Sequence, residues 1–227
     1  MTSWSMFDVG CCCGEVCDVF DDLDTFDEFN ADRWRRSKSG SLPLPTAQNG
    51  QLYMPFGKTS FFDPTPFSQV LADADCPDNL PLLPWSVGTL FRVSVTLTNF
   101  STFNDGPSIY QARPTFAIGR PGTQLTLVGV GFTANPTNHL LWAPGFTTTI
   151  ANDPEPGQRM EIEIEQLTSG TAEIRWRLNG VIVQGRNITT FGATAGMQFL
   201  LHVNTQDSLP GTGFARWDDW SWEIIEP

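Results

Sequence analysis

Positively charged residues are scarce in this chain. Its 227 residues hold 13 lysines and arginines against 25 aspartates and glutamates, a formal net charge of −12 at pH 7. Affinity for nucleic acids comes largely from basic side chains that neutralise phosphates, so this balance argues against a nucleic-acid partner. An anionic membrane surface would repel the chain for the same reason.

Long apolar runs are also lacking. The best candidate, LTLVGVGF at 125–132, is far shorter than the ~20 apolar residues of a membrane-spanning helix, so no membrane insertion is expected. The first residues, MTSWSMFDVGCCCGEVC, have neither the basic stretch nor the apolar core of a signal peptide. We therefore expect a virion or another extracellular assembly reached without a secretion signal, or a cytoplasmic location if the protein is not exported.

Cysteines are few and unevenly placed. Four of the five lie within seven residues, and the odd total leaves at least one thiol free or paired with another chain. Three interpretations remain open: a soft-metal site, which neither CxxC spacing nor a nearby histidine supports; local or intermolecular disulfides formed in an oxidising medium; and inert cysteines. The clustered cysteines are Cys11, Cys12, Cys13 and Cys17.

Turn-forming and aromatic residues are plentiful, with 20 Gly, 17 Pro, 17 Phe and 8 Trp. Short apolar runs alternate with Gly, Pro, Asn and Asp at intervals typical of a β-sandwich. In RVSVTLTNF (92–100) and EIRWRLNG (173–180), apolar and polar residues alternate, which gives each strand one dry and one wet face. We predict an all-β domain of two packed antiparallel sheets over 19–227, preceded by a Cys-rich N-terminal arm over 1–18.

Three motifs follow one another along the chain. They are TFDEFNADRWRRSKSG (25–40) with NGQLYM (49–54), then MEIEIEQLTSGTAEIRWRLNGVIVQG (160–185), then GFARWDDWSWEI (213–224). Together they resemble the opening strands, the recurring hairpin and the last strand of the concanavalin A-like jelly-roll superfamily. The resemblance implies two curved sheets. Lectins, carbohydrate-binding modules, glycosidases, adhesion domains and phage surface proteins share this fold, so the fold does not choose among these functions.

The acidic stretch MEIEIEQL (160–167) raises the enzymatic option, because laminarinase-type glycoside hydrolases carry their catalytic carboxylates on a similar strand. In those enzymes the acidic strand comes well before the W-x-x-N/D-G hairpin. Here the glutamates lie on the first strand of that hairpin, and no carboxylate occurs between Asp105 and Asp153, where the enzymes' strand would fall. We therefore predict no catalytic residues.

A structural role for the same glutamates follows from the hairpin. If Thr168-Ser169-Gly170 is a three-residue loop with Gly170 in the left-handed region, Glu163 faces Arg175 and Glu161 faces Arg177 across the strands. Such pairs contribute roughly 0.2–1 kcal/mol each. The glutamates are predicted to form the solvated face of a hairpin.

Candidate binding residues lie near turns. Sugars stack on aromatic platforms, and Trp85 and Trp142 are the tryptophans closest to turns, whereas Trp176, Trp220 and Trp222 alternate with polar residues as core positions do. His139 follows a turn and is a candidate hydrogen-bond donor to a ligand.

The resemblance also implies a possible structural calcium between the first and last strands, near Asp22 and Asp219. No D-x-D-x-D-G loop supports it. No other cofactor is expected.

The sequence thus favours a non-enzymatic structural or adhesion module of an extracellular assembly, such as a phage virion or tail component that recognises surface glycans. Its partners would be glycans or neighbouring subunits of an oligomer, with the Cys-rich arm docking adjacent copies. A soluble carbohydrate-binding lectin module is the first alternative. A laminarinase-type glycoside hydrolase is the second.

Overall fold

The computed structural model describes residues 34–38, 43–58, 67–72, 87–105, 108–111, 113–119, 126–132, 138–152, 155–168, 170–188, 198–204 and 211–225. These residues form sixteen strands and no helix. Within the same ranges, therefore, no helix is long and apolar enough to cross a membrane. The predicted Cys-rich arm lies outside the described residues.

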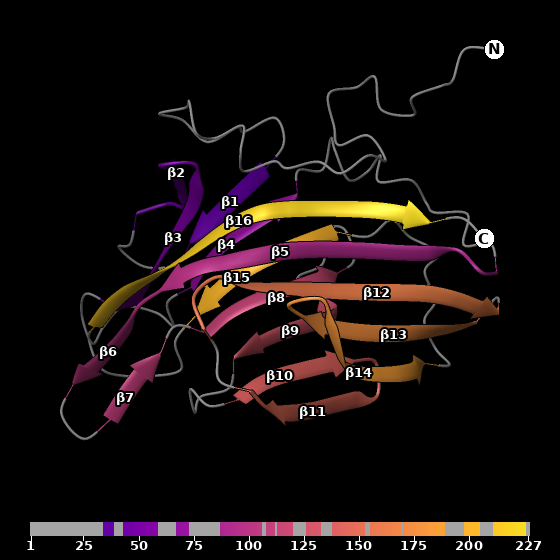
Figure 1. The fold of residues 1–227 in the computed structure, drawn as a ribbon. Helices are drawn as coiled ribbons and strands as arrows, with labels where there is room; N and C mark the ends of the chain where they lie inside the picture. The colour runs from indigo at the N-terminus through magenta and orange to yellow at the C-terminus, as the bar shows by residue number, and fades with distance from the viewer. Residues whose placement is uncertain are drawn as a thin grey trace, which may run out of the picture.

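Fourteen of the strands form two seven-stranded antiparallel sheets that face each other as a sandwich (Figure 1). We call them sheet A and sheet B. Sheet A has the order β1 (Trp34–Lys38), β4 (Phe67–Ala72), β15 (Gln198–Asn204), β8 (Arg113–Gly119), β9 (Thr126–Phe132), β10 (Asn138–Ala143) and β11 (Phe146–Ala151). Sheet B has the order β14 (Val181–Ile188), β13 (Thr171–Leu178), β12 (Gln158–Thr168), β5 (Leu90–Phe100), β16 (Gly211–Ile225), β3 (Gln51–Lys58) and β2 (Thr46–Gln48). A separate hairpin joins β6 (Thr102–Asp105) to β7 (Ser108–Gln111).

The alternation read from the sequence matches the observed faces, and the predicted all-β sandwich is confirmed. Inward-facing side chains of both sheets form one hydrophobic core, in which Trp176 and Trp217 are the largest fully buried side chains. Trp220, also predicted as core, is 3% exposed. The polar partners on the same strands, such as Arg175 and Arg177, point to the outer face of sheet B and are about a quarter exposed.

Two tight turns follow the rule for two-residue hairpins. The turn between β13 and β14 is Asn179-Gly180, with φ of 50° and 77°, and the turn between β2 and β3 is Asn49-Gly50, with φ of 54° and 69°. Positive φ at both central residues gives the turn a twist that matches the twist of the strands, and Asn-Gly is the favoured pair.

The β12–β13 hairpin has the predicted register but a different loop. Glu163 is opposite Arg175 and Glu161 is opposite Arg177, as predicted. Gly170, however, does not have a positive φ, so its left-handed assignment was wrong. Thr168 pairs with Thr171, and a bulge lies between Gln166 and Thr168. The turn is one residue shorter than predicted, and the bulge accommodates the extra residue. The pairing beyond the bulge is therefore the predicted one.

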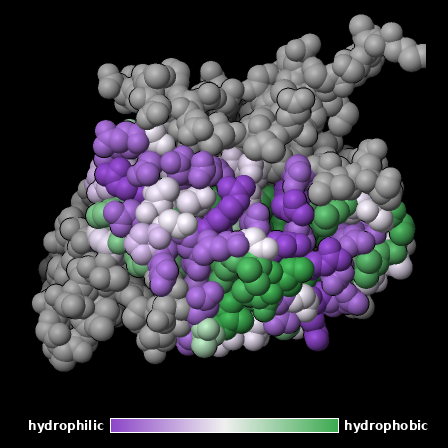
Figure 2. Space-filling view, viewed as in Figure 1, coloured by the Kyte–Doolittle hydropathy of each residue, from purple (hydrophilic) through white to green (hydrophobic). Residues whose placement is uncertain are grey.

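Strand β14 is an edge of sheet B. A bulge at Val183 interrupts its pairing with β13, and the guanidinium of Arg186 lies 5.4 Å from the ring centre of Phe146 in β11, at the adjoining edge of sheet A. In Figure 2 a hydrophobic patch lies over the start of β14, where Val181 and Ile182 are 65% and 49% exposed.

Candidate functional site

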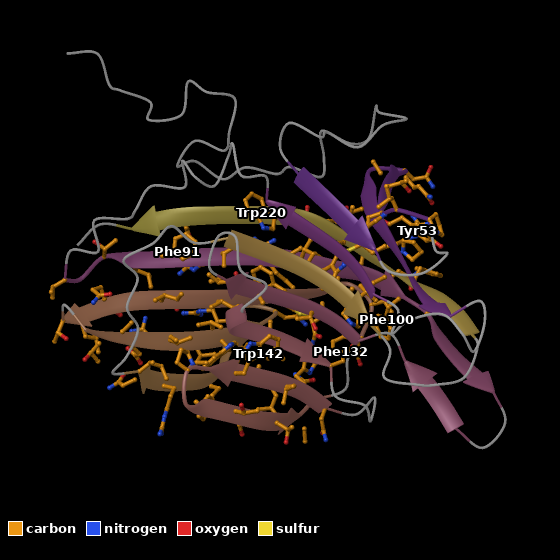
Figure 3. All side chains as sticks on the ribbon, turned by 180° about the vertical axis from the view of Figure 1, so that it is seen from behind. Tyr53, Phe91, Phe100, Phe132, Trp142 and Trp220 are labelled. Atoms are coloured by element: carbon orange, nitrogen blue, oxygen red, sulfur yellow. The ribbon has the colours of Figure 1, made fainter. Side chains whose placement is uncertain are left out.

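Trp142 lies on the outer face of sheet A (Figure 3). In β10 the residues His139, Leu141 and Ala143 are buried, whereas the alternate positions, including Trp142, are only half-buried. Because successive side chains of a strand point to opposite faces, Trp142 points away from the core. Its neighbours in the sheet are Gly129 of β9 and Thr147 of β11.

The indole of Trp142 lies flat on Gly129. A Cβ atom built on Gly129 would be 2.0 Å from Cζ2 of the indole and 2.5 Å from each of its two bonded neighbours, Cε2 and Cη2. The distances to Cε2 and Cη2 are equal and only slightly longer than the distance to Cζ2. The line from Cζ2 to the Cβ position is therefore perpendicular to the ring plane. One face of the indole is thus turned toward the Cβ position of Gly129.

The sheet neighbours of the indole are uncharged. On β11, Thr147 is opposite Trp142 and Thr149 is opposite Leu140, and both threonines are exposed. On β9 the position next to Leu140 is Gly131, which is covered by Thr115. The seven strands of sheet A contain no aspartate or glutamate at all. We call Trp142, Gly129, Leu140, Thr147 and Thr149 the Trp142 platform.

The outer face of sheet B has the opposite character, because it carries a lattice of ion pairs centred on Glu163. The Glu163 carboxylate accepts hydrogen bonds from Nε of Arg92 at 2.8 Å and Nε of Arg177 at 2.9 Å, with Nη1 of Arg175 at 3.7 Å. Its side chain is 1% exposed. The prediction of a solvated glutamate face was therefore wrong for Glu163, because the surrounding arginines cover it.

Other ion pairs of this lattice run diagonally between strands or along one strand. Arg175, though opposite Glu163, makes its shortest contacts with Glu165 and Glu173. Glu161, opposite Arg177, has its ion pair with Arg159 at 3.5 Å. Long arginine side chains reach past the directly opposite residue, so register alone does not determine the partner.

Electrostatics makes Glu163 a poor catalytic acid. Burial alone would raise the pKa of its carboxyl, but the hydrogen bonds and charges of Arg92 and Arg177 outweigh burial and lower the pKa. A glycosidase general acid needs a raised pKa, and a nucleophile needs access to the substrate. Glu163 has neither property.

His139 does not lie where a ligand could reach it. It is fully buried between the sheets, its Nδ1 atom 2.8 Å from the carbonyl oxygen of Asn152 and its Nε2 atom 2.6 Å from the side-chain amide of Gln158 in β12. Its ring meets Phe132 edge-on at 5.1 Å. The interpretation of His139 as a ligand donor beside a turn is thus at odds with its position, and we leave it out of the candidate site.

The tautomer of His139 follows from its partners. A carbonyl oxygen only accepts, so Nδ1 carries the proton and donates to Asn152. Burial lowers the pKa of the imidazole, which favours the neutral ring with Nε2 as an acceptor. The structure places Oε1 of Gln158 opposite Nε2; with the neutral ring, a half-turn of the amide would present its NH2 as the donor to Nε2 instead.

The other predicted site residues are only partly covered by the structure. Trp85, Asp22, Cys11, Cys12, Cys13 and Cys17 lie outside the described residues. Asp219 is exposed, and its carboxylate accepts a hydrogen bond from Thr96 at 3.2 Å.

The described residues do not by themselves fit a calcium ion. Within them, no group of three acidic, histidine or cysteine side chains is placed to hold a metal ion, whereas calcium takes six to eight oxygens. The calcium site near Asp22 and Asp219 stays a prediction.

Compared by sequence, the chain matches no protein-family model and no curated protein. Compared by structure, it is similar to a protein from a study of endo-acting O-glycanases that human gut bacteria express to initiate mucin breakdown. That match has a TM-score of 0.56 and 10% identity, and covers 92% of this chain and 99% of the other. A mutant carbohydrate recognition domain of Emp46p gives 0.54 and 7%, covering 92% and 96%.

A family 7 alginate lyase in complex with product gives a TM-score of 0.50 at 13% identity, covering 88% of this chain and 97% of the lyase. These matches extend over nearly the whole chain, and the two-sheet arrangement agrees with them. The protein has the concanavalin A-like jelly-roll fold of lectins and glycanases.

Sequence reasoning missed Gly129, although a signal was present. The run VGVGF (128–132) places Gly129 and Gly131 on the same face of a strand, where they leave space that an aromatic ring from a neighbouring strand can fill. Which strand supplies that ring depends on the pairing of β9 with β10, and the sequence did not show it.

Proposed function

We propose that this chain recognises glycans without cleaving them, and that the Trp142 platform is the binding surface. The observation that carries the proposal is the face-on contact of the Trp142 indole with Gly129 on an outer sheet face. A pyranose ring has an apolar face of C–H groups, and an indole with one face held against a glycine offers its other face as a flat surface on which that sugar face can stack. The exposed hydroxyls of Thr147 and Thr149 are close enough in the sheet to hydrogen-bond the sugar edge.

Two further observations support binding rather than hydrolysis at this face. Retaining and inverting glycosidases need two carboxyl groups beside the scissile bond. The strands of sheet A supply none, and the glutamates of β12 are on the opposite face of the sandwich, where arginines hold them. The glycanase and the lyase of similar fold make cleavage the competing function.

A glycan array tests the proposal. The wild-type chain is expected to give saturable binding, and Trp142→Ala is expected to lose it without loss of cooperative unfolding. Phe214→Ala is the matched control, because Phe214 is also a half-buried aromatic on an outer face, stacked on Tyr53 in sheet B. Absence of wild-type binding, binding unaffected by Trp142→Ala, or release of cleaved sugars would each overturn the proposal.

The predicted place in a virion or extracellular assembly is a separate hypothesis. Glycan recognition at an outer sheet face is compatible with it, and detection of the chain in purified particles, with copies in contact through residues 1–18, would support it.

A further inference from the structure

The Trp142 platform has a support on the inner side of the same sheet. We propose that Trp176 in β13 is a positioning residue for the Trp142 indole and acts through the backbone of Gly129. This inference rests on the glycan-binding role proposed above, because it concerns the orientation of that binding surface.

The connection between the two tryptophans is direct. Trp176 is fully buried, and its indole Nε1 donates a hydrogen bond to the carbonyl oxygen of Gly129 at 3.0 Å. The same glycine carries the Trp142 ring on its outer side. One residue of β9 is therefore held between an indole from sheet B beneath it and an indole from β10 above it.

Trp176 also reaches the strand on the other side of β10. Its ring centre lies 5.7 Å from that of Phe146 in β11, with an angle of 33° between the rings. Phe146 directly precedes Thr147, which is opposite Trp142. Trp176 thus contacts both strands that flank β10, one by a hydrogen bond and one by ring packing.

This arrangement fixes the plane of the platform. The position of the Trp142 ring depends on the backbone of Gly129, because Cζ2, Cε2 and Cη2 of that ring are the atoms nearest to the Cβ position of the glycine. A buried carbonyl that loses its donor shifts to find another partner or stays unsatisfied. Loss of the Trp176 N–H is therefore expected to tilt the surface on which a sugar stacks, even when the core remains filled.

The test compares Trp176→Phe with Trp217→Phe in protein labelled with 5-fluorotryptophan. Both tryptophans are fully buried in sheet B, but Nε1 of Trp217 has no hydrogen-bond partner in the described part of the chain. The 19F resonance of Trp142 is assigned by its absence in Trp142→Phe. Two probes are used: a soluble nitroxide, which broadens resonances of accessible rings, and methyl β-galactoside, a pyranose that can stack on an indole.

In Trp176→Phe the Trp142 resonance is expected to move, with altered nitroxide broadening, while unfolding stays cooperative. In Trp217→Phe the resonance is expected to stay in place. If Trp176→Phe does not fold, 3-benzothienylalanine at position 176 serves instead, because it keeps the shape of the indole and replaces only the N–H that bonds Gly129. An unchanged Trp142 resonance in Trp176→Phe or in its substitute would overturn the positioning role.

The two probes separate the two proposals. A wild-type resonance that does not respond to methyl β-galactoside argues against stacking of this sugar and so against the proposed function. Nitroxide broadening of the Trp142 resonance tests the positioning role independently of any sugar. Where both probes respond, Trp176→Phe is expected to reduce the sugar-induced shift and Trp217→Phe to preserve it.

Discussion

The substitution Glu163→Gln directly tests the ion-pair lattice on the outer face of sheet B. It keeps the shape of a side chain that is 1% exposed, and it removes the charge on which Arg92 and Arg177 converge. Among the described residues, the second carboxylate oxygen, Oε2, has no hydrogen-bond partner, and Arg175 lies 3.7 Å from it. In the variant, either an amide NH2 faces this guanidinium or the amide turns and presents its NH2 to the other two arginines.

The magnitude follows from the two charge-assisted hydrogen bonds. A hydrogen bond to a charged group contributes about 1.5–3 kcal/mol and a neutral one about 0.5–1.5. Both arginines keep their charge in the variant and only the acceptor is neutralised, so about 2–3 kcal/mol is the upper limit of the cost of the two bonds. For a chain of this size, each kcal/mol lowers Tm by about 2–4 °C, so a loss of up to roughly 12 °C is expected.

Thermal and urea unfolding at several pH values measure this loss, with Glu161→Gln as the control. Glu161 lies two residues away on the same face, and its partner Arg159 is 3.5 Å away and 38% exposed, so less than about 0.5 kcal/mol is expected. The pKa of Glu163 is lowered on folding. Its stabilisation is therefore present above the unfolded pKa of about 4.3 and is lost as pH falls through the folded value.

The difference between wild type and Glu163→Gln should accordingly shrink below about pH 4. Equal effects of the two variants at neutral pH, or a difference that does not depend on pH, would refute the stabilising role of the ion-pair lattice around Glu163.

Two further predictions concern the interior and a turn. Burial lowers the pKa of His139, so the free energy of unfolding is expected to fall as pH drops from about 6.5 through the folded pKa. Urea unfolding at several pH values measures this slope, and His139→Phe should remove it. An unchanged slope in the variant would contradict the neutral buried ring. Gly180→Ala is expected to cost about 1 kcal/mol because φ is 77° there, whereas Gly185→Ala, with its nearest neighbour atom at 3.7 Å, should be close to neutral. Similar thermal unfolding of these two variants would count against the turn assignment.

Local alternation predicted much of the fold. RVSVTLTNF (92–100) was predicted as a strand with one dry face and lies within β5, where Val93, Val95 and Leu97 are buried. By contrast β11, with the sequence FTTTIA, was not predicted, because three consecutive threonines give little polar contrast between the two faces of an edge strand. The loop at Gly170 was predicted wrongly because a bulge and a tight turn give the same register as a longer loop without a bulge.

The candidate site was only partly predictable. Trp142 was selected because it lies near a turn, but the property that makes it a platform is its pairing with Gly129, which depends on sheet register. The burial of His139 could have been predicted, since His139 and Leu141 are two residues apart and share a face. The ion-pair partners of Glu163 could not, because Arg92 comes from a strand 71 residues away in sequence.

The edge strand β14 also limits how copies of this chain can join. An open edge can act as a template on which a second chain adds a strand, and continuous sheets that run from molecule to molecule grow in this way. The bulge at Val183 breaks the regular spacing of backbone groups that such addition needs. Arg186 would also place a charge at the solvent-excluded interface between two sandwiches joined in this way. An assembly built from this domain is therefore not expected to join its copies by adding strands at β14.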